Sequence, residues 1–396
     1  MGRTVPSIGA PPPSQRKDAR AKRAKQTVNK DIPALLQAYS RARRGIEASE
    51  LIVDPPAAEF ESEDKTSKGR GVNSKDVKQS IETAANHPAK ASMDGSASSS
   101  IPFEIHFRVA DTLDAATDLH RSSQSRSPKS SRIAVLNMAS PLRPGGGFLN
   151  GATSQEESLC MRTTLYPSLK EEFYRLPEVG AIYTPDVLVF RSHDAEATDL
   201  PKNERFFVDV ITAAMHRMPD VEEDEEGEKA YADDKDRDAA EQKMRAVMRI
   251  AKSKGVKKLV LGAWGCGAYR NPVSEIAAAW KRVLLSGGHA SPRTNRKQNS
   301  SSAERWSGMR VVFAIKERKI AESFAASFGV ELNEGSDSLG QRDIAKDDDD
   351  DDGGNEADDD ELQAKIDELE SQIATTRSDV LKDRLRSVLD KLKTSG

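Results

Sequence analysis

The sequence predicts an α/β protein in which a mainly parallel sheet is covered by helices. Short, continuous apolar runs recur along the chain, a texture typical of strands buried inside such a sheet. Helical patterns lie between these runs, and the alternation of strand and helix favours parallel neighbours. The strands predicted from these runs are 133–136, 187–190, 206–211, 259–261 and 311–315, and 103–107 is predicted as a half-buried strand because its apolar residues alternate. The predicted helices are 156–169, 239–254, 272–285 and 320–328.

The composition indicates one well-packed domain with long solvated segments around it. Of 396 residues, 36% are hydrophobic and 31% are charged, a polar mixture for a chain of this length. We expect the main domain over 31–332, starting with a helix that Asp31 caps. The segments expected outside its core are a disordered basic arm (1–30), mobile inserts (about 57–100, 219–238 and 286–308), an acidic linker (333–361) and an amphipathic helix (362–393).

The two terminal segments each leave alternatives open. The basic arm fits nuclear import or nucleic-acid contact, and it fits a plain solubilising tail equally well. Apolar residues at spacings of three and four from Leu362 to Leu392 predict the last helix. We favour partner binding or self-association for it over docking on its own domain, because the acidic run 347–352 separates it from the core.

Several classes of protein are not expected from this sequence. No run of about 18 apolar residues predicts a membrane span, and the beginning of the chain has no apolar signal region. Two cysteines are too few for a disulfide scaffold, and the six histidines are scattered. We therefore expect a reduced, intracellular protein that uses no metal and no cofactor.

The most informative stretch joins a strand end to a helix start. The strand ends near Leu136, the glycines Gly145, Gly146 and Gly147 follow, and a helix starts near Gln155 with Glu156 and Glu157. Glycines there let a ligand lie against the backbone, at the strand end where α/β folds bind ligands. A flexible turn and simple capping acids would give each feature alone. Together they favour a catalytic site.

The two acids are expected to have different roles. Neighbouring helical residues point about 100° apart, so Glu156 and Glu157 are not expected to flank one bond as paired glycosidase acids do. One should act and the other should position the substrate. We expect Glu157 to be the general acid, and then the base that activates the attacking water.

A second glycine-rich turn, 262–271, follows another predicted strand and precedes a helix at Pro272. Exposed backbone N–H groups in such a turn form a nest for phosphate oxygens. We interpret Cys266 as a small residue in a tight loop and not as a nucleophile, because no base adjoins it in the sequence. Tyr269 could lie against the ligand, and Trp264 is expected in the core.

These motifs together resemble the catalytic domain of microbial-type poly(ADP-ribose) glycohydrolases. The resemblance covers about 30–332, includes fungal-like features near the chain start, and is most specific in the spacing from the three glycines to Gln155-Glu156-Glu157. The strings that carry it are Leu136-Asn137-Met138-Ala139-Ser140, Pro144 to Gly147, Gly151-Ala152, Gln155 to Cys160, Leu165-Tyr166, Leu261 to Gly267 with Asn271-Pro272, Val311 to Ile315, Ala42 to Ile46 and Val53 to Pro56.

The resemblance implies a macrodomain-like fold, a mixed sheet between helices, that cuts ribose–ribose bonds to release ADP-ribose. It implies poly(ADP-ribose) or an ADP-ribosylated protein as the partner and no metal or cofactor. From the basic arm we expect a place in the nucleus, and we expect a role in the DNA-damage response. Glu157 matches the catalytic glutamate and Glu156 its ribose-binding neighbour. The other matched substrate-binding positions are Asn137 at the distal ribose, Gly145, Gly146 and Gly147 on the ribose side, Gln155, and Gly265, Cys266, Gly267, Ala268 and Tyr269 at the diphosphate.

Three positions depart from the pattern of the resembled family, namely Met138, Met161 and Tyr269, and they bear on the fit of the substrate. The changes at Met138 and Met161 keep a second interpretation open, a macrodomain that binds ADP-ribose without cutting it. A third reading is a hydrolase of mono(ADP-ribosyl) links or of an ADP-ribose ester. A fourth is an interaction scaffold that uses the basic arm and the last helix.

Overall fold

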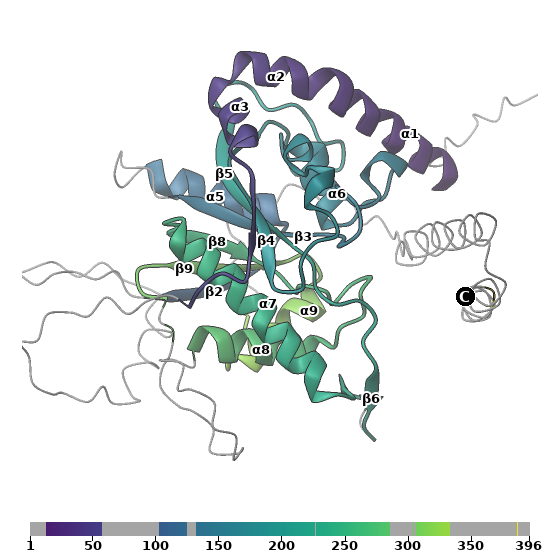
Figure 1. Cartoon of the computed structure of the whole chain (residues 1–396), viewed down its shortest axis with the longest axis vertical. Helices are drawn as coiled ribbons and strands as arrows, with labels where there is room; N and C mark the ends of the chain where they lie inside the picture. Colours follow the sequence, from purple (N-terminus) through teal and green to yellow (C-terminus); the bar gives the residue numbers. More distant parts are fainter. Residues whose placement is uncertain are drawn as a thin grey trace, which may run out of the picture.

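The computed structural model describes residues 13–57, 103–124, 132–225, 227–285, 304, 306–332 and 386. Its centre is a seven-stranded sheet in the order β1-β4-β5-β3-β8-β9-β2, with helices on both faces (Figure 1). The strands are β1 (Glu50–Val53), β2 (Glu104–Val109), β3 (Ile133–Met138), β4 (Gly180–Val189), β5 (Phe206–Ala213), β8 (Lys258–Leu261) and β9 (Arg310–Ile315).

The sheet is mixed, as the resemblance implies. Strands β5, β3, β8, β9 and β2 are mutually parallel, whereas β4 pairs antiparallel with β5, and β1 antiparallel with β4. All six predicted strands are found. Five of them are continuous apolar runs because both faces are covered, whereas the alternating run 103–107 belongs to the half-buried edge strand β2. The prediction of an α/β protein with a mainly parallel sheet is thereby confirmed.

The helices form two layers with separate apolar cores. The first layer, α7 (Asp234–Ser253), α8 (Val273–Leu285) and α9 (Arg318–Ser327), packs over a core that contains Trp264, Trp280 and Phe313. The second layer, α5 (Thr112–Gln124) and α6 (Gln155–Arg162), packs over the opposite face around Val135 and Phe148. Figure 1 shows the sheet edge-on between the layers.

The parallel strands end at one common edge of the sheet. The loop 139–154 leaves β3 at that edge and leads into α6, and the loop 262–272 leaves β8 and leads into α8. Because neighbouring parallel strands deliver their loops side by side, this edge brings the two glycine-rich motifs together.

The prediction of a disordered basic arm is wrong for its described part. Residues 13–31 form a helix, α1 (Pro13–Gln26), continued by the wider turn η1 (Thr27–Asp31). Next come α2 (Ile32–Ala38) and α3 (Ser40–Glu47). Figure 1 shows α1 to α3 on the side of α6, away from α7 and α8. Asp31 does not cap α2 with its side chain; its carboxylate accepts a hydrogen bond from Arg191 instead.

Helix α1 has no apolar stripe. Hydrogen bonds from its arginine side chains hold it on the domain instead. Arg20 Nε donates to Gly151 O at 2.7 Å, and Arg23 donates to the carbonyls of Glu196 and Ala197. Ala24 is the small buried residue that lets the helix approach. A periodicity search for apolar faces misses such a helix, although its lysines, arginines and alanines are strong helix formers.

The predicted insert 219–238 is also structured. It contains the hairpin β6 (Val221–Glu223) and β7 (Lys229–Tyr231), and α7 already begins at Asp234. The hairpin sequence is polar like that of a loop because its residues are almost all exposed. Its exception is Tyr231, which is buried and contacts the second glycine loop. The helix predicted over 156–169 ends earlier, at Arg162, and continues as short 3-10 turns.

The remaining segment predictions fall largely outside the described residues. These are residues 1–12 of the arm, the insert 57–100 except for Ala57, most of the insert 286–308, the acidic linker and the last helix except for Arg386. Among the helices that the structure describes, none is long and apolar enough to cross a membrane.

Candidate active site

Gln155 fastens the start of α6 to the end of β3. Its side-chain amide donates to Leu136 O at 2.8 Å and accepts from Met138 N at 2.9 Å. A third contact, from Nε2 to Thr112 Oγ1, is 3.3 Å long. Since the amide is occupied by protein groups, the predicted substrate-binding residue Gln155 positions the acids that follow it.

Glu156 is buried at the end of β3, with 2% of its surface exposed. One carboxylate oxygen accepts from Ser140 N at 2.8 Å, and the other accepts from Asn137 Nδ2 at 3.4 Å. Asn137 also donates to Thr212 Oγ1 on β5 at 3.2 Å. The predicted pair of Asn137 and Glu156 is therefore directly linked.

Glu157 faces the glycine turn. Its Oε1 accepts from Gly147 N at 2.8 Å, and its Oε2 accepts from the hydroxyl of Ser154, the residue before the helix. The side chain is buried, with 6% of the residue exposed. Two donors thus fix the carboxylate that we expected to be the general acid.

Gly146 lies between the two carboxylates. A Cβ added to it would stand 2.6 Å from Glu157 Oε1 and 2.9 Å from Glu156 Oε2, so these two oxygens are no farther apart than the sum of the two distances. Its φ of 55° also disfavours any side chain. The acids therefore converge more closely than their divergent Cα directions suggested. Only glycine leaves both of them room.

Burial and mutual repulsion make the pair hold a proton. The pKa of Glu156 is raised from 4.5 to about 8, first by burial and then by the charge of Glu157. Hydrogen bonds from Ser140 and Asn137 oppose the rise but do not cancel it. At neutral pH the pair therefore carries one proton, as two adjoining carboxylates commonly do.

Two buried polar atoms beside the pair have no hydrogen-bond partner among the described residues. They are Asn137 Oδ1 and the hydroxyl of Tyr174, which follows the turn η4 (Glu171–Phe173). Burial raises the pKa of the Tyr174 hydroxyl, and the nearby charge of Glu156 raises it further.

The second glycine loop is folded around Asn271. Its Nδ2 donates to His216 O at 2.9 Å and to Gly265 O at 3.0 Å, and its Oδ1 accepts from the hydroxyl of Tyr231 at 2.8 Å. Gly265 has a φ of 85°, and a Cβ there would meet Asn271 Nδ2 at 2.7 Å. This asparagine therefore sets the shape of the loop.

The apex of this loop is open. A Cβ on Gly267 would meet no atom within 4 Å. Within the described part of the chain, no acceptor is hydrogen-bonded to the N–H groups of Gly267 and Ala268. Tyr269 lies near the guanidinium of Arg217, which is 6.0 Å from its ring centre. Free N–H groups and a nearby cation suit an anionic ligand.

The thiol of Cys266 is unsuited to nucleophilic attack. Burial raises its pKa to about 12, so the thiol stays protonated at neutral pH. Trp264, two residues earlier, is 1% exposed and packs against Trp280 in the core. Both observations agree with the interpretation of this stretch as a tight structural turn.

The two loops meet over the end of β3. A Cβ on Gly262, just after β8, would stand 2.3 Å from Met138 Cε at the end of β3. Farther on, Asn271 reaches the carbonyl of His216, which follows β5. Since β3 lies between β5 and β8, the second loop spans the strand end from which the first loop starts.

The departures at Met138 and Met161 lie in different surroundings. Met138 contacts Gly262 between the loops and can therefore influence a ligand there. Met161 packs away from the acids, where its sulfur lies 3.7 Å from Thr27 Oγ1 and 3.5 Å from an Arg191 nitrogen. The second change supports the packing of the N-terminal helices and says little about substrate.

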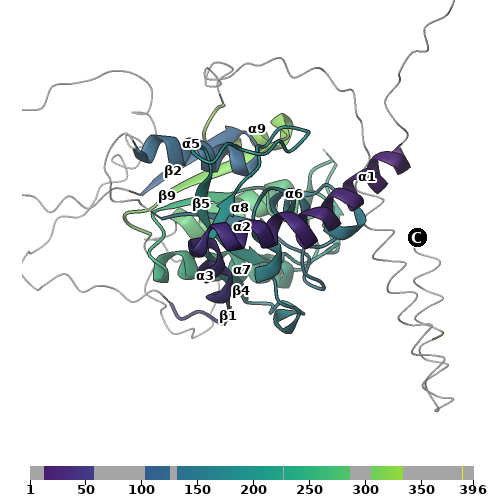
Figure 2. The ribbon, with the colours of Figure 1, turned by 90° about the horizontal axis from the view of Figure 1, so that it is seen from above.

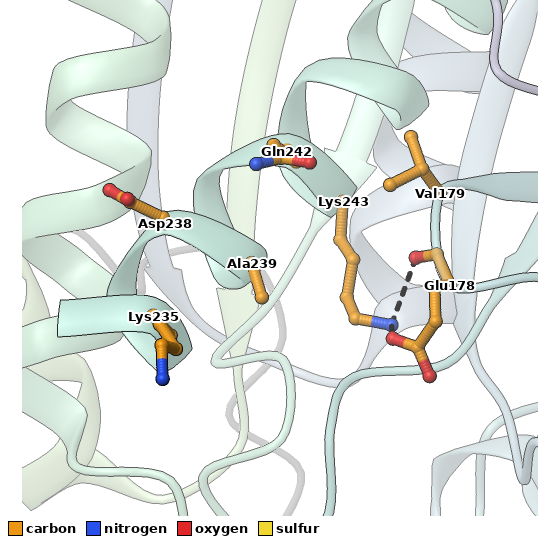
Figure 3. Close-up of a pocket in the computed structure, with 7 residues that line it drawn as sticks. All are labelled: Glu178, Val179, Lys235, Asp238, Ala239, Gln242 and Lys243. Atoms are coloured by element: carbon orange, nitrogen blue, oxygen red, sulfur yellow. Dashed lines mark hydrogen bonds and ion pairs between the residues drawn. The ribbon is translucent and has the colours of Figure 1, made fainter. Parts of the chain in front are cut away.

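Two surface hollows lie away from the acids. One, of about 360 Å³, lies between α7 and the segment before β4, where Lys243 Nζ binds Glu178 O at 2.9 Å (Figure 3). The other, of about 570 Å³, is bordered by Arg23 and Arg191. Neither contains a predicted site residue. Within the described residues, no group of His, Cys, Asp or Glu side chains could hold a metal ion.

Sequence reasoning missed several residues of the site, namely Ser140, Ser154, Thr212, Tyr174 and Asn271. Ser154 had a readable signal, because Ser154 and Glu157 have the spacing of a capping box at a helix start. Asn271 stood directly before Pro272, the predicted start of a helix. Thr212 and Tyr174 come from distant segments, and no local pattern indicates their contacts.

Fold and site together define a macrodomain-like α/β protein with a buried pair of carboxylates at the edge where two glycine-rich loops leave the parallel strands. The chain's residues 61–192 match the family model of the microbial-type poly(ADP-ribose) glycohydrolase (PARG) catalytic domain. This span contains the first glycine loop and both acids. The predicted resemblance is thereby confirmed for these residues.

Solved structures with a similar fold are bacterial enzymes. Poly(ADP-ribose) glycohydrolase from Thermomonospora curvata bound to the inhibitor ADP-HPD is 22% identical, with a TM-score of 0.50 over 78% of this chain and 99% of that one. A second structure of that enzyme has 22% identity and a TM-score of 0.51, over 78% and 100%. The Deinococcus radiodurans enzyme with ADP-ribose has 21% identity and a TM-score of 0.46, over 73% and 96%. No curated protein matches the chain in sequence.

Proposed function

We propose that the chain is a poly(ADP-ribose) glycohydrolase that hydrolyses ribose–ribose bonds and releases ADP-ribose. One observation carries the proposal. The carboxylate of Glu157 is buried, fixed by Gly147 N–H and paired with a second acid at the edge where both glycine loops lie. The matching family model and the inhibitor-bound relative from Thermomonospora curvata support it.

Glu157 acts as the acid and then as the base. In its protonated form it gives a proton to the oxygen that leaves with the departing ribose, while the bond from the anomeric carbon to that oxygen breaks. The transition state resembles an oxocarbenium ion, which the remaining carboxylate charge stabilises. A water molecule then adds to the anomeric carbon, and its proton returns to Glu157.

Glu156 supplies the second half of this arrangement. Its raised pKa provides a proton to the pair at neutral pH. Both carboxyl groups border Gly146, so this proton is held beside Glu157. In its charged form Glu156 accepts hydrogen bonds from the ribose hydroxyls, with Asn137 orienting its head.

The second glycine loop binds the diphosphate. The N–H groups of Gly267 and Ala268 have no protein acceptor among the described residues, and the space beside Gly267 is open. Arg217 adds positive charge beside Tyr269. This arrangement supports a pyrophosphate held next to the acids, which fixes the sugar for cleavage.

Polymer hydrolysis by Glu157→Gln, followed by thin-layer chromatography of released ADP-ribose, tests the proposal. We expect turnover to fall by about a hundred- to ten-thousand-fold, because the acid step is lost. The melting temperature should still rise with ADP-ribose, since the loops remain. Glu204→Gln, at an exposed glutamate, is the matched control and should keep full activity. Equal release by both variants would contradict the role of Glu157.

Placement in the nucleus and a role in the DNA-damage response are part of the same proposal. The basic residues near the start of the chain support it. Because α1 packs on the domain, deleting 1–30 would disturb the fold, so imaging should use substitutions of exposed lysines such as Lys22 and Lys25. We also propose that 362–393 binds a partner or a second copy of the chain, although this segment lies outside the described residues apart from Arg386.

A further inference from the structure

Helix α1 has one face that is fixed to the catalytic loop. Arg20 Nε donates to Gly151 O, and a Cβ on Gly151 would stand 2.3 Å from Lys17 O. Gly151 has a φ of 83°, which suits this close approach of two backbones. Four residues after Gly151, the helix α6 that carries both acids begins. Figure 2 shows α1 running along the outer side of α6.

The opposite face of α1 is positively charged and exposed. The helix contains six basic residues and one acid, Asp18. Lys22 and Lys25, three positions apart, point outward, and Lys30 is exposed in η1 just beyond. Among the described residues, none of these three lysines has an ion-pair partner. Their charge is therefore available to a ligand.

We propose that this outward face, Lys22, Lys25 and Lys30, binds the phosphates of the poly(ADP-ribose) chain beyond the unit being cut. The proposal rests on the proposed function. It says which surface binds the part of a long polymer that extends beyond the catalytic acids. Each ADP-ribose unit carries a pyrophosphate with two negative charges. A polymer whose terminal sugar is at the acids must leave over neighbouring surface, and α1 adjoins the loop that leads into those acids.

Charge and position together favour the polymer over a nucleic acid. A single-stranded nucleic acid would also be attracted to the lysines, because phosphate contacts carry no sequence information. However, a nucleic-acid site has no need to be fastened to a catalytic loop. Arg20 and Gly151 make that fastening, so the helix that carries the lysines is attached to the loop that leads into the acids.

The experiment compares long polymer with the ADP-ribose dimer, the shortest substrate that contains the ribose–ribose bond. The variant is Lys22→Glu/Lys25→Glu in the full chain. We expect kcat/KM for long polymer to fall about tenfold at low salt, through weaker electrostatic attraction. The dimer should be cut as by the wild type. The slope of log kcat/KM against log salt should become shallower by about 0.7 for each phosphate that the variant no longer binds.

Two further variants separate charge from structure. Lys22→Arg/Lys25→Arg should restore the long-polymer rate, and Lys319→Glu, on the exposed surface of α9 across the sheet, should leave it unchanged. An equal decrease on dimer and polymer would mean a disturbed fold and would overturn the inference. So would an unchanged polymer rate, or a decrease in single-stranded DNA binding alone. A wild type that cuts neither substrate would instead refute the proposed function.

Discussion

The raised pKa of Glu156 predicts that Glu156→Gln stabilises the protein at high pH. The folded protein holds a proton on this carboxyl between pH 4.5 and about 8, whereas the unfolded chain has already released it. The contribution of this group to folding stability is therefore fully present below pH 4.5 and is lost as pH rises through about 8. Glutamine is uncharged at every pH, like the protonated acid, so the variant does not lose this stability as pH rises.

The size of the effect follows from the shift. One pKa unit corresponds to about 1.4 kcal/mol, so a rise from 4.5 to about 8 corresponds to about 5 kcal/mol of unfolding free energy. The residue is 2% exposed, so solvent screening does little to reduce this value. In a domain of this size, we expect a difference of about 10 to 20 °C in melting temperature.

Thermal unfolding of both proteins at pH 5, 7 and 9 measures the difference. At pH 5 the two melting temperatures should nearly coincide, and at pH 9 the variant should melt higher. A control at the exposed residue Glu204, Glu204→Gln, should show no such dependence. In the infrared, the protonated carboxyl band seen for wild type at pH 6 should be missing from Glu156→Gln. A stability gap that stays constant from pH 5 to pH 9 would refute the reasoning.

Two further outcomes follow from the loops. Gly146→Ala should reduce polymer hydrolysis by at least about a hundredfold in a turnover assay and weaken ADP-ribose binding by calorimetry, because its Cβ would displace both carboxylates, including the Glu156 head that binds the ribose hydroxyls; full activity would contradict their convergence. Tyr231→Phe removes a buried hydrogen bond to Asn271, so unfolding by denaturant should show a decrease in stability of about 1 kcal/mol, and ADP-ribose should bind more weakly; unchanged affinity would show that the hairpin does not support the second loop.

The sheet and the acids could be predicted from sequence because their signals are local. The strands around Val135, Val260 and Val312 are covered on both faces and therefore appear as continuous apolar runs. The pair Glu156 and Glu157 stood out because a glycine loop and a helix start adjoin it.

Other features depend on geometry that spacing does not encode. The 100° rule concerns Cα directions, whereas long side chains can bend back, as both acids do toward Gly146. Helix α1 is secured by hydrogen bonds from Arg20 and Arg23 to distant carbonyls, which leave no periodic pattern. Tyr231 belongs to a hairpin so polar that only its buried ring distinguishes it from a loop.

The pairing of β3 with β8 ends at Val135 and Val260, and beyond that point the Gln155 amide bonds to the β3 backbone as a further strand would. β3 and β8 thus stop pairing before β3 ends, and the Gln155 side chain takes up the free backbone groups of β3 there. As a consequence, the position of the acids relative to β3 is fixed by backbone hydrogen bonds, as the position of a neighbouring strand would be. A slip of β3 by one residue would turn Asn137 to the other face and carry α6 out of line, so the registration of the sheet itself determines whether the protein can act.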